Sequence, residues 1–258
     1  MKKIAFMIVY NDVDYVDYAI RSIVDWVDEM IIVEGAFEIT MAQGKPARSD
    51  DGTLEILKTH SVNPKITIIH ANKREHKDHY DIGYQQACER GADWAIMIDS
   101  DEIWGRMNQS LAESWMNRVG PNIKEMRISE YCFINDFRTY YNGTYPRIFR
   151  CEPEAFFVFD NEVQFSEGRG RHDILSIPEI QMRVFHYGYV RRKKRWELKQ
   201  DYMFEKDQNP VLENYKLEGN TYIIPNDIPI YKFIGRHLPI MQRHPFHNMT
   251  AEEIIYGK

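Results

Sequence analysis

Cysteine is scarce in this chain of 258 residues, and its few cysteines are far apart. They occupy positions 88, 132 and 151 and have no paired spacing. Zinc knuckles and disulfide frameworks both depend on characteristic cysteine spacings, so the sequence predicts neither. We therefore expect a protein of a reducing compartment, the cytoplasm.

Glycine is missing from the first 34 residues, and Gly35 is the first to occur. A sugar nucleotidylyltransferase would need a glycine-rich phosphate loop directly after the first strand. The sequence also has no P-loop and no Gly-x-Ser-x-Gly nucleophile elbow. The missing glycine loop argues against a nucleotidylyltransferase, which stays open as an alternative.

Positive net charge and a membrane-length apolar run are missing as well. The formal net charge of −6 argues against a nucleic-acid partner. The apolar run over residues 4–10 is too short to span a bilayer and lacks a small-residue cleavage site, so we interpret it as a first strand. One basic cluster, Arg191–Arg195, could contact an anionic membrane surface peripherally, although a solvated face explains most of its side chains better.

The first hundred residues alternate between strand and helix patterns. Apolar runs over 4–10, 30–33, 66–69 and 94–98 are separated by segments with helical spacing. This order predicts an α/β protein with a mostly parallel central sheet flanked by helices. Residues 105–258 read as a mixed α+β half, with shorter strand-like runs, a charged helix near 192–206, and a proline-broken tail of loops and short turns. We expect one continuous globular unit.

The most informative feature is the acidic turn Asp99-Ser100-Asp101-Glu102, which follows a buried apolar strand. Carboxylates this close repel one another unless a positive charge lies among them. Mg²⁺ or Mn²⁺ suits carboxylate oxygens and commonly shares its coordination with substrate phosphates. Taken alone, the pattern is also that of an ordinary polar turn after a strand.

The other predicted strands also end in polar residues, and parallel strands end at one edge of a sheet, where ligands gather. These residues are Tyr10, Asn11 and Asp12 after the first strand, Glu34 after the second, and His70 with Asn72 after the third. Four such strand ends favour one shared ligand site.

These segments resemble the nucleotide-sugar-binding half of family 2 glycosyltransferases, which have the GT-A, Rossmann-like fold. The resemblance covers residues 2–104 and rests on Asn11-Asp12, on residues 27–34 and on residues 96–102 with their Asp-x-Asp motif. It implies that residues 1–104 bind the donor and that 105–258 bind the acceptor. It implies a metal ion on Asp101 and Asp99, and nucleotide contacts from Tyr10, Asn11, Asp12, Glu34, Lys77, Asp99 and Ser100.

The sequence departs from the family pattern in two places. Glu34 stands where the family usually has Asp, and a long insertion separates it from the polar run Ser49–Thr53. The usual Arg-Asn pair before the third helix is replaced by Tyr80-Asp81. The candidates for the cationic contact there are Lys73, Arg74, His76 and Lys77, of which Lys77 is the one assigned to the nucleotide. A UDP-sugar is the favoured donor, with GDP- and dTDP-sugars as alternatives.

The second half carries weaker candidates. His186 could complete the metal site, or it could be a satisfied core histidine. A base must also take the proton of the acceptor hydroxyl; Glu162 is the first candidate and Asp136 the second, with an ordinary surface acid as the alternative for both. Contacts with the diphosphate or with the acceptor are assigned to Arg191, Lys194, Arg147 and Arg150, with plain salt bridging as the alternative for the last two.

The resemblance thus implies a metal-dependent, hexosyltransferase-type glycosyltransferase. It would move a sugar from a nucleotide diphosphate sugar to the hydroxyl of a carbohydrate or glycan, with inversion. A catalytically inactive nucleotide- or carbohydrate-binding protein on the same scaffold remains the alternative outside the enzymes.

Overall fold

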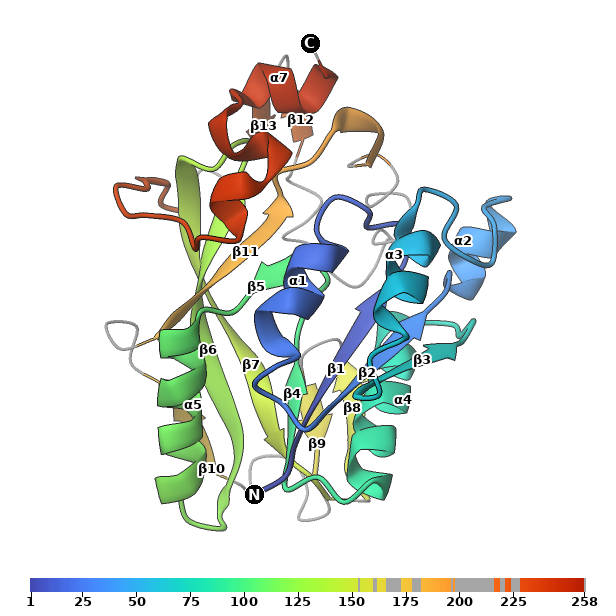
Figure 1. Cartoon of the computed structure of the whole chain (residues 1–258), viewed down its shortest axis with the longest axis vertical. Coiled ribbons are helices and arrows are strands. Elements are labelled where there is room, and N and C mark those ends of the chain that lie inside the picture. Colours follow the sequence, from blue (N-terminus) through green and yellow to red (C-terminus); the bar gives the residue numbers. More distant parts are fainter. Residues whose placement is uncertain are drawn as a thin grey trace. The chain divides into compact units, whose positions relative to one another are not determined.

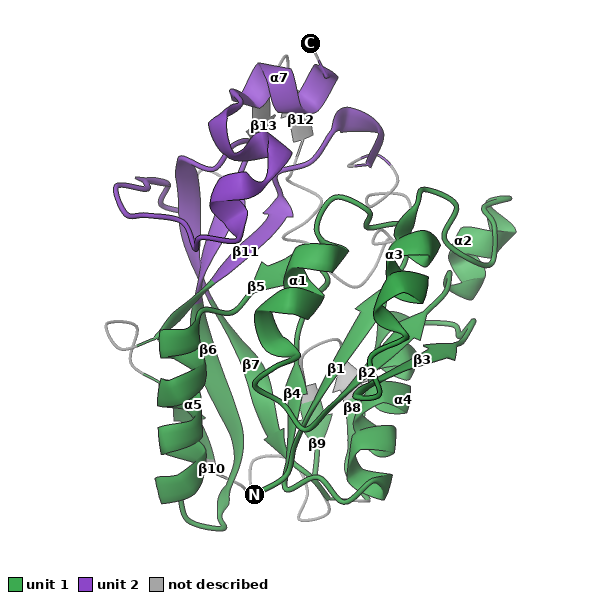
Figure 2. Ribbon diagram, in the orientation of Figure 1, with its two compact units in different colours: residues 1–129, 144–184 green, residues 130–143, 185–258 purple. Residues whose placement is uncertain are grey.

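Figure 1 shows the computed structural model of the chain, in which helices flank a central β-sheet. The structure describes residues 1–152, 154–159, 162–165, 173–177, 182–195, 197, 216–218, 221–223 and 228–257. The chain divides into two compact units (Figure 2). Unit 1 comprises residues 1–129 and 144–184, and unit 2 comprises residues 130–143 and 185–258.

Four parallel strands form the part of the sheet that positions the predicted site, in the order β3-β2-β1-β4. They are β1 (Lys3–Val9), β2 (Glu29–Glu34), β3 (Ile66–His70) and β4 (Trp94–Met97). Val9 pairs with Glu34, and Glu34 pairs with His70, so these strands end side by side. The predicted α/β class and all four predicted strands are confirmed.

Helix α4 (His76–Glu89) packs closely on the sheet and buries the aromatic rings of Tyr80 and Tyr84 against Phe6. Gly83 makes this approach possible, because a Cβ atom there would lie 2.8 Å from the Phe6 ring. Helix α1 (Val16–Ile23) buries its apolar stripe, and α3 (Thr53–His60) lies between β2 and β3 in the chain.

The second half of the sequence supplies long antiparallel strands as well as short ones. Strand β7 (Thr139–Arg150) pairs antiparallel with β4, and β6 (Ile123–Ile134) lies between β7 and β11 (Arg183–Tyr189). The remaining elements are α2 (Glu38–Ala42), β5 (Glu102–Ile103), α5 (Arg106–Arg118), β8 (Phe156–Phe159), β9 (Glu162–Gln164), β10 (Asp173–Ser176), β12 (Lys216–Glu218), β13 (Thr221–Ile223), β14 (Tyr231–Lys232), η2 (Met241–Arg243), η3 (Pro245–Asn248) and α7 (Ala251–Tyr256).

Unit 2 has an aromatic core in which Phe133 stacks on Tyr187 and contacts His237. His237 is held by the Tyr187 hydroxyl and by the carbonyl of Phe137. The prediction that the tail forms only loops and turns is wrong for α7. Thr250 and Glu253 cap this helix reciprocally and two isoleucines anchor it. Most of the predicted helix at 192–206 lies outside the described residues.

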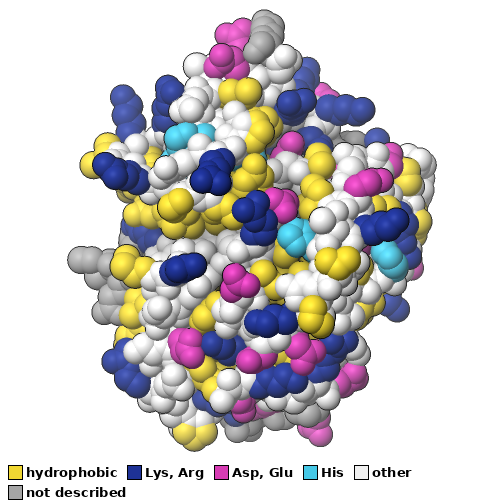
Figure 3. Space-filling view, in the orientation of Figure 1, with side chains coloured by type: hydrophobic (Ala, Val, Ile, Leu, Met, Phe, Trp, Pro, Cys, Tyr) yellow, Lys and Arg dark blue, Asp and Glu magenta, His cyan; other side chains and the backbone are white. Residues whose placement is uncertain are grey.

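The distribution of charge on the surface and the length of the helices bear on nucleic-acid and membrane partners. Basic and acidic side chains are intermixed on the face drawn in Figure 3. Among the described residues, no helix has the length and hydropathy needed to cross a bilayer.

Candidate active site at the carboxyl edge of the parallel sheet

The acidic turn follows β4 directly and is built around Arg147. The Arg147 guanidinium donates from Nη2 to Asp99 Oδ2 at 2.8 Å and from Nε to Glu102 Oε2 at 2.7 Å. Tyr80 donates its hydroxyl to the other oxygen of Asp99 at 3.2 Å. Arg147 is 2% exposed, so β7 brings a buried cation to acids that lie 45 and 48 positions away in the sequence.

Glu102 has a structural part in this turn. Its side chain is fully buried, and its second oxygen accepts a hydrogen bond from the indole of Trp104 at 2.6 Å. Asp101 is 3% exposed. Arg147 offsets one of the three carboxylate charges of the turn, and the remaining two match a divalent cation. Carboxylate oxygens are the donors that Mg²⁺ and Mn²⁺ prefer, so Asp101 and Asp99 fit the predicted metal.

The loop after β1 is tied to the acidic turn and to a later segment of the chain. Ser100 donates its hydroxyl to Asp12 Oδ2, which joins the ends of β1 and β4. Asn11 has a positive φ of 51°, and its backbone N–H donates to the Ser49 hydroxyl at 2.9 Å. The Asn11 side-chain amide donates to the Asp50 carboxylate and accepts a hydrogen bond from the Asp50 backbone N–H.

The Glu34 carboxylate is completely enclosed at the end of β2. It accepts hydrogen bonds from the backbone N–H and the hydroxyl of Ser49, and it lies 2.9 Å from Nδ1 of His70. Tyr10 donates its hydroxyl to the carbonyl of Pro46. Burial, with nearby Asp50 and Glu34, raises the pKa of Tyr10 to about 12, so its hydroxyl keeps its proton.

Sequence reasoning missed that residues 46–53 fold back over the ends of β1 and β2. Besides the Ser49 and Asp50 contacts, Thr53 accepts a hydrogen bond from the Asp12 backbone at 2.8 Å. The Arg48 side chain within this segment is 37% exposed, and the His70 side chain beside it is 51% exposed. The signal available in the sequence was the run Ser-Asp-Asp-Gly-Thr, whose Gly52 has a φ of 106°.

Direct nucleotide contact by Tyr10, Asn11, Asp12 and Glu34 stays a prediction. Their side chains are buried and form the scaffold beneath the 46–53 segment. Ser100 and Asp99 are partly exposed. Lys77 lies in the first turn of α4 and pairs with Glu75 at 3.1 Å.

Arg150 has mainly structural contacts. Its guanidinium lies 4.2 Å from the centre of the Trp94 ring and donates to the carbonyls of Ile123 and Gly120. The alternative of a structural role was open for Arg147 and Arg150, and these contacts support it. A contact of either residue with acceptor or phosphate stays a prediction.

The two candidates for the base, Glu162 and Asp136, lie in different elements of the chain. Glu162 begins β9, which pairs with β8, and its side chain lies outside the described part of the structure. Asp136 lies in the β6–β7 turn of unit 2, where its carboxylate accepts a hydrogen bond from the Arg138 backbone. Their roles as the base stay predictions.

Two basic candidates and His186 also belong to unit 2. Arg191 is 4% exposed and donates to the carbonyl of Gly188, so it adds nothing to an exposed basic surface, whereas Lys194 is exposed. His186 lies 2.9 Å from Glu130 through Nδ1. Since Asp99 and Asp101 belong to unit 1, a metal site shared with His186 stays a prediction, as does the membrane contact.

No protein-family model matches the sequence, and no curated protein matches it. Among solved structures, its fold is similar to that of a mannosyltransferase from Pyrobaculum calidifontis in complex with GDP-mannose and Mn²⁺. The identity is 12%, the TM-score is 0.45, and the match covers 78% of this chain and 61% of that one. This chain thus matches less than two thirds of the mannosyltransferase's length.

Two further structures are similar at this level. TarS residues 1–349 from S. aureus share 12% identity, with a TM-score of 0.43 and coverage of 83% of this chain and 69% of that one. A 4-diphosphocytidyl-2C-methyl-D-erythritol synthase from Anaerococcus prevotii shares 8%, with a TM-score of 0.38 and coverage of 78% and 95%. Function is therefore inferred below from the residues of the site itself.

Proposed function

We propose that this protein is a metal-dependent glycosyltransferase that moves a sugar from a nucleotide diphosphate sugar to an acceptor hydroxyl. The observation that carries the proposal is the hydrogen bond between Ser100 and Asp12. It joins the acidic turn, which suits a cation and a diphosphate, to the loop that is connected through Ser49 to Glu34 and His70. One edge of one sheet thus offers oxygen donors for a cation beside hydrogen-bonding groups for a nucleoside.

The parts of the donor have separate places in this proposal. Asp101 and Asp99 would hold the cation, and the bound cation would act as a Lewis acid on the departing diphosphate. Arg147 and Tyr80 fix the orientation of the Asp99 carboxylate. The exposed His70 ring, anchored on Glu34, is the group best placed to face the base or the ribose.

The chemistry of the acceptor follows from the class of reaction. A carboxylate takes the proton of the acceptor hydroxyl while that oxygen attacks the anomeric carbon, and Glu162 is assigned this step ahead of Asp136. Attack from the side opposite the diphosphate inverts the anomeric centre. UDP-sugars are the first donors to test, followed by GDP- and dTDP-sugars.

Titration calorimetry with UDP, GDP and dTDP, each with and without Mn²⁺, tests the donor site. We expect one nucleotide to bind much more tightly with Mn²⁺ than without it. The Asp101→Asn variant should lose this dependence on Mn²⁺ and keep its fold, because the change preserves shape and removes charge. Asp25→Asn is the matched control, since Asp25 is exposed and lies outside the site.

Three results would contradict the proposal. Nucleotide binding that does not depend on a metal would remove Asp101 and Asp99 from their assigned role. Release of pyrophosphate from a nucleoside triphosphate and a sugar phosphate would identify a nucleotidylyltransferase instead. Metal-dependent binding without hydrolysis or transfer from any of the nucleotide sugars would identify a binding protein.

A further inference from the structure

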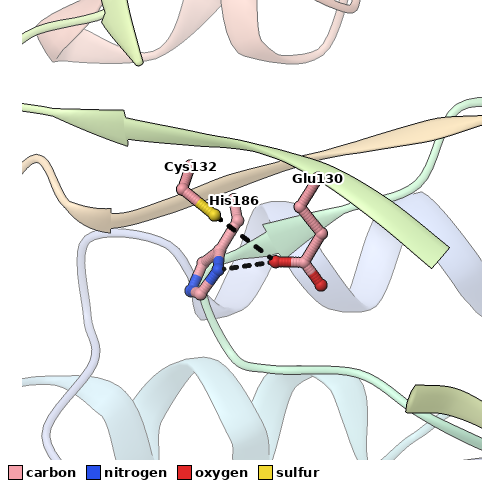
Figure 4. A group of neighbouring side chains, drawn as sticks. All are labelled: Glu130, Cys132 and His186. Carbon is pink, nitrogen blue, oxygen red and sulfur yellow. Dashed lines mark hydrogen bonds and ion pairs between the residues drawn. The ribbon is translucent and has the colours of Figure 1, made fainter. Parts of the chain in front are cut away.

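Three side chains with metal-binding atoms meet inside unit 2, away from the acidic turn in the sequence. Glu130 and Cys132 are two residues apart on β6, so they lie on the same face of that strand. His186 comes from the neighbouring strand β11. Figure 4 shows the carboxylate, the thiol and the imidazole turned toward one another. One ligand atom from each residue lies within 4.8 Å of the other two.

The distances are close to those around a tetrahedral zinc ion. Glu130 Oε2 lies 2.9 Å from His186 Nδ1 and 3.8 Å from Cys132 Sγ. Ordinary Zn–S, Zn–N and Zn–O bond lengths at tetrahedral angles separate the ligand atoms by about 3.4 Å for N and O and about 3.6 Å for S and O. Shifts of about half an ångström or less would therefore bring these two distances to zinc geometry.

The charges of the set also suit a zinc ion. Glu130 and Cys132 are both fully buried, and the His186 side chain is 13% exposed. Zn²⁺ with a thiolate, a carboxylate and a neutral imidazole has a total charge of zero, which lowers the cost of burying each charged group. The ion would displace the thiol proton, and the neutral imidazole would bind through Nδ1 with its one proton on Nε2.

We propose that Glu130, Cys132 and His186 form a transition-metal site that prefers Zn²⁺ over Mg²⁺ and Mn²⁺. The thiolate and the imidazole select the softer ion, whereas the acids of the turn after β4 select a hard one. Water would be the fourth ligand. The ion would join β6 to β11 within unit 2 and would stabilise this part of the sheet. His186 is also the candidate third ligand for the ion of the acidic turn, so the two proposals share this residue.

Cobalt provides the most direct test, because Co²⁺ bound to a thiolate gives a near-ultraviolet charge-transfer band. The full-length protein, stripped of metal with a chelator, is titrated with Co²⁺ and then with Zn²⁺. We expect one Co²⁺ per chain with that band, and its loss as Zn²⁺ replaces Co²⁺. Mn²⁺ at the same concentration should not displace the Co²⁺. A spectrum without the sulfur band, or no binding in competition with a chromophoric chelator, would overturn the proposal and leave a purely hydrogen-bonded trio.

Variants identify the ligands and separate this site from the donor site. Cys132→Ser should remove the band, and Glu130→Gln should weaken Zn²⁺ binding by about tenfold or more. Cys88→Ser, at a half-buried thiol of unit 1, is the matched control and should keep the band. Asp101→Asn should leave it unchanged. A band that survives Cys132→Ser or disappears in Cys88→Ser would refute the assignment, and neither outcome bears on nucleotide binding.

Discussion

Replacing Arg147 by methionine should strongly destabilise unit 1, because the change leaves two acids without their buried cation. Methionine keeps an unbranched, flexible side chain and removes the charge. Arg147 is 2% exposed, and its partner Glu102 is fully buried. Removing one member of a buried ion pair typically costs about 3–5 kcal/mol, mostly from the uncompensated charge that remains. We expect a loss of that size in the free energy of unfolding.

Urea unfolding at neutral pH, followed by circular dichroism, measures this loss. Arg21→Met is the matched control, because Arg21 pairs with Asp17 on the exposed surface of α1, with side-chain exposures of 54% and 34%. Exposed pairs of this spacing contribute about 0.3–0.5 kcal/mol. The control should therefore change the free energy of unfolding by less than about 1 kcal/mol.

A second substitution separates the charge from the packing. In the Arg147→Met background, Glu102→Gln removes the buried charge while keeping the shape of the side chain. If the uncompensated carboxylate causes the loss, the double variant should recover at least about 1 kcal/mol. A cost below about 1 kcal/mol for Arg147→Met would refute the view that this cation holds the acidic turn. No recovery in the double variant would instead assign the loss to packing.

Two further predictions concern stability. Burial lowers the pKa of His79 from 6.5 to about 4, so as the pH falls His79 is protonated in the unfolded chain before it is protonated in the folded one. The free energy of unfolding therefore carries no penalty from His79 above pH 6.5 and should fall by about 2 kcal/mol between pH 7 and pH 5. Urea unfolding at each pH measures this decline, which should be shallower in His79→Gln. Gly83→Ala should lower the free energy of unfolding by about 1–3 kcal/mol in thermal unfolding, because the added Cβ meets Phe6. Gly120→Ala is the control and should be nearly neutral, because no atom lies within 4 Å of a Cβ there. Equal effects of the two substitutions would contradict the close packing of α4.

The strands and helices of the first hundred residues could be predicted because local patterns determine them. The apolar runs at 4–10 and 94–98 are buried on both faces, which makes them recognisable without any partner. Strand β6 is longer than the short strand-like runs predicted for the second half, since it pairs with β7 on one side and, on the other, with β11 from a later part of the chain. Helix α7 was missed because the tail was interpreted from its prolines alone, without regard to the capping box of Thr250 and Glu253.

The acids of the site could be found from the sequence, but their partners could not. Three of the four residues from Asp99 to Glu102 are acidic, so the sequence alone indicates that their charges repel one another. Arg147, which relieves part of this repulsion, lies 45 positions beyond Glu102. In the same way, Ser49 donates a hydrogen bond to Glu34, although an insertion whose path no local pattern predicts separates them in the sequence. Long-range pairing of this kind depends on the path of the whole chain.

The same reasoning explains why the spacing of the three cysteines gives no sign of the group around Cys132. Their spacing in the sequence predicts no metal site, because motif searches look for ligands a few residues apart. Cys132 gains its partners from strand geometry instead: Glu130 is two residues away on the same face of β6, and His186 lies on β11, 54 positions further on in the sequence. In a β-sheet, neighbours on one face come from alternate positions of a strand and from adjacent strands. A search for metal ligands in such proteins therefore needs the strand order before it needs the spacing.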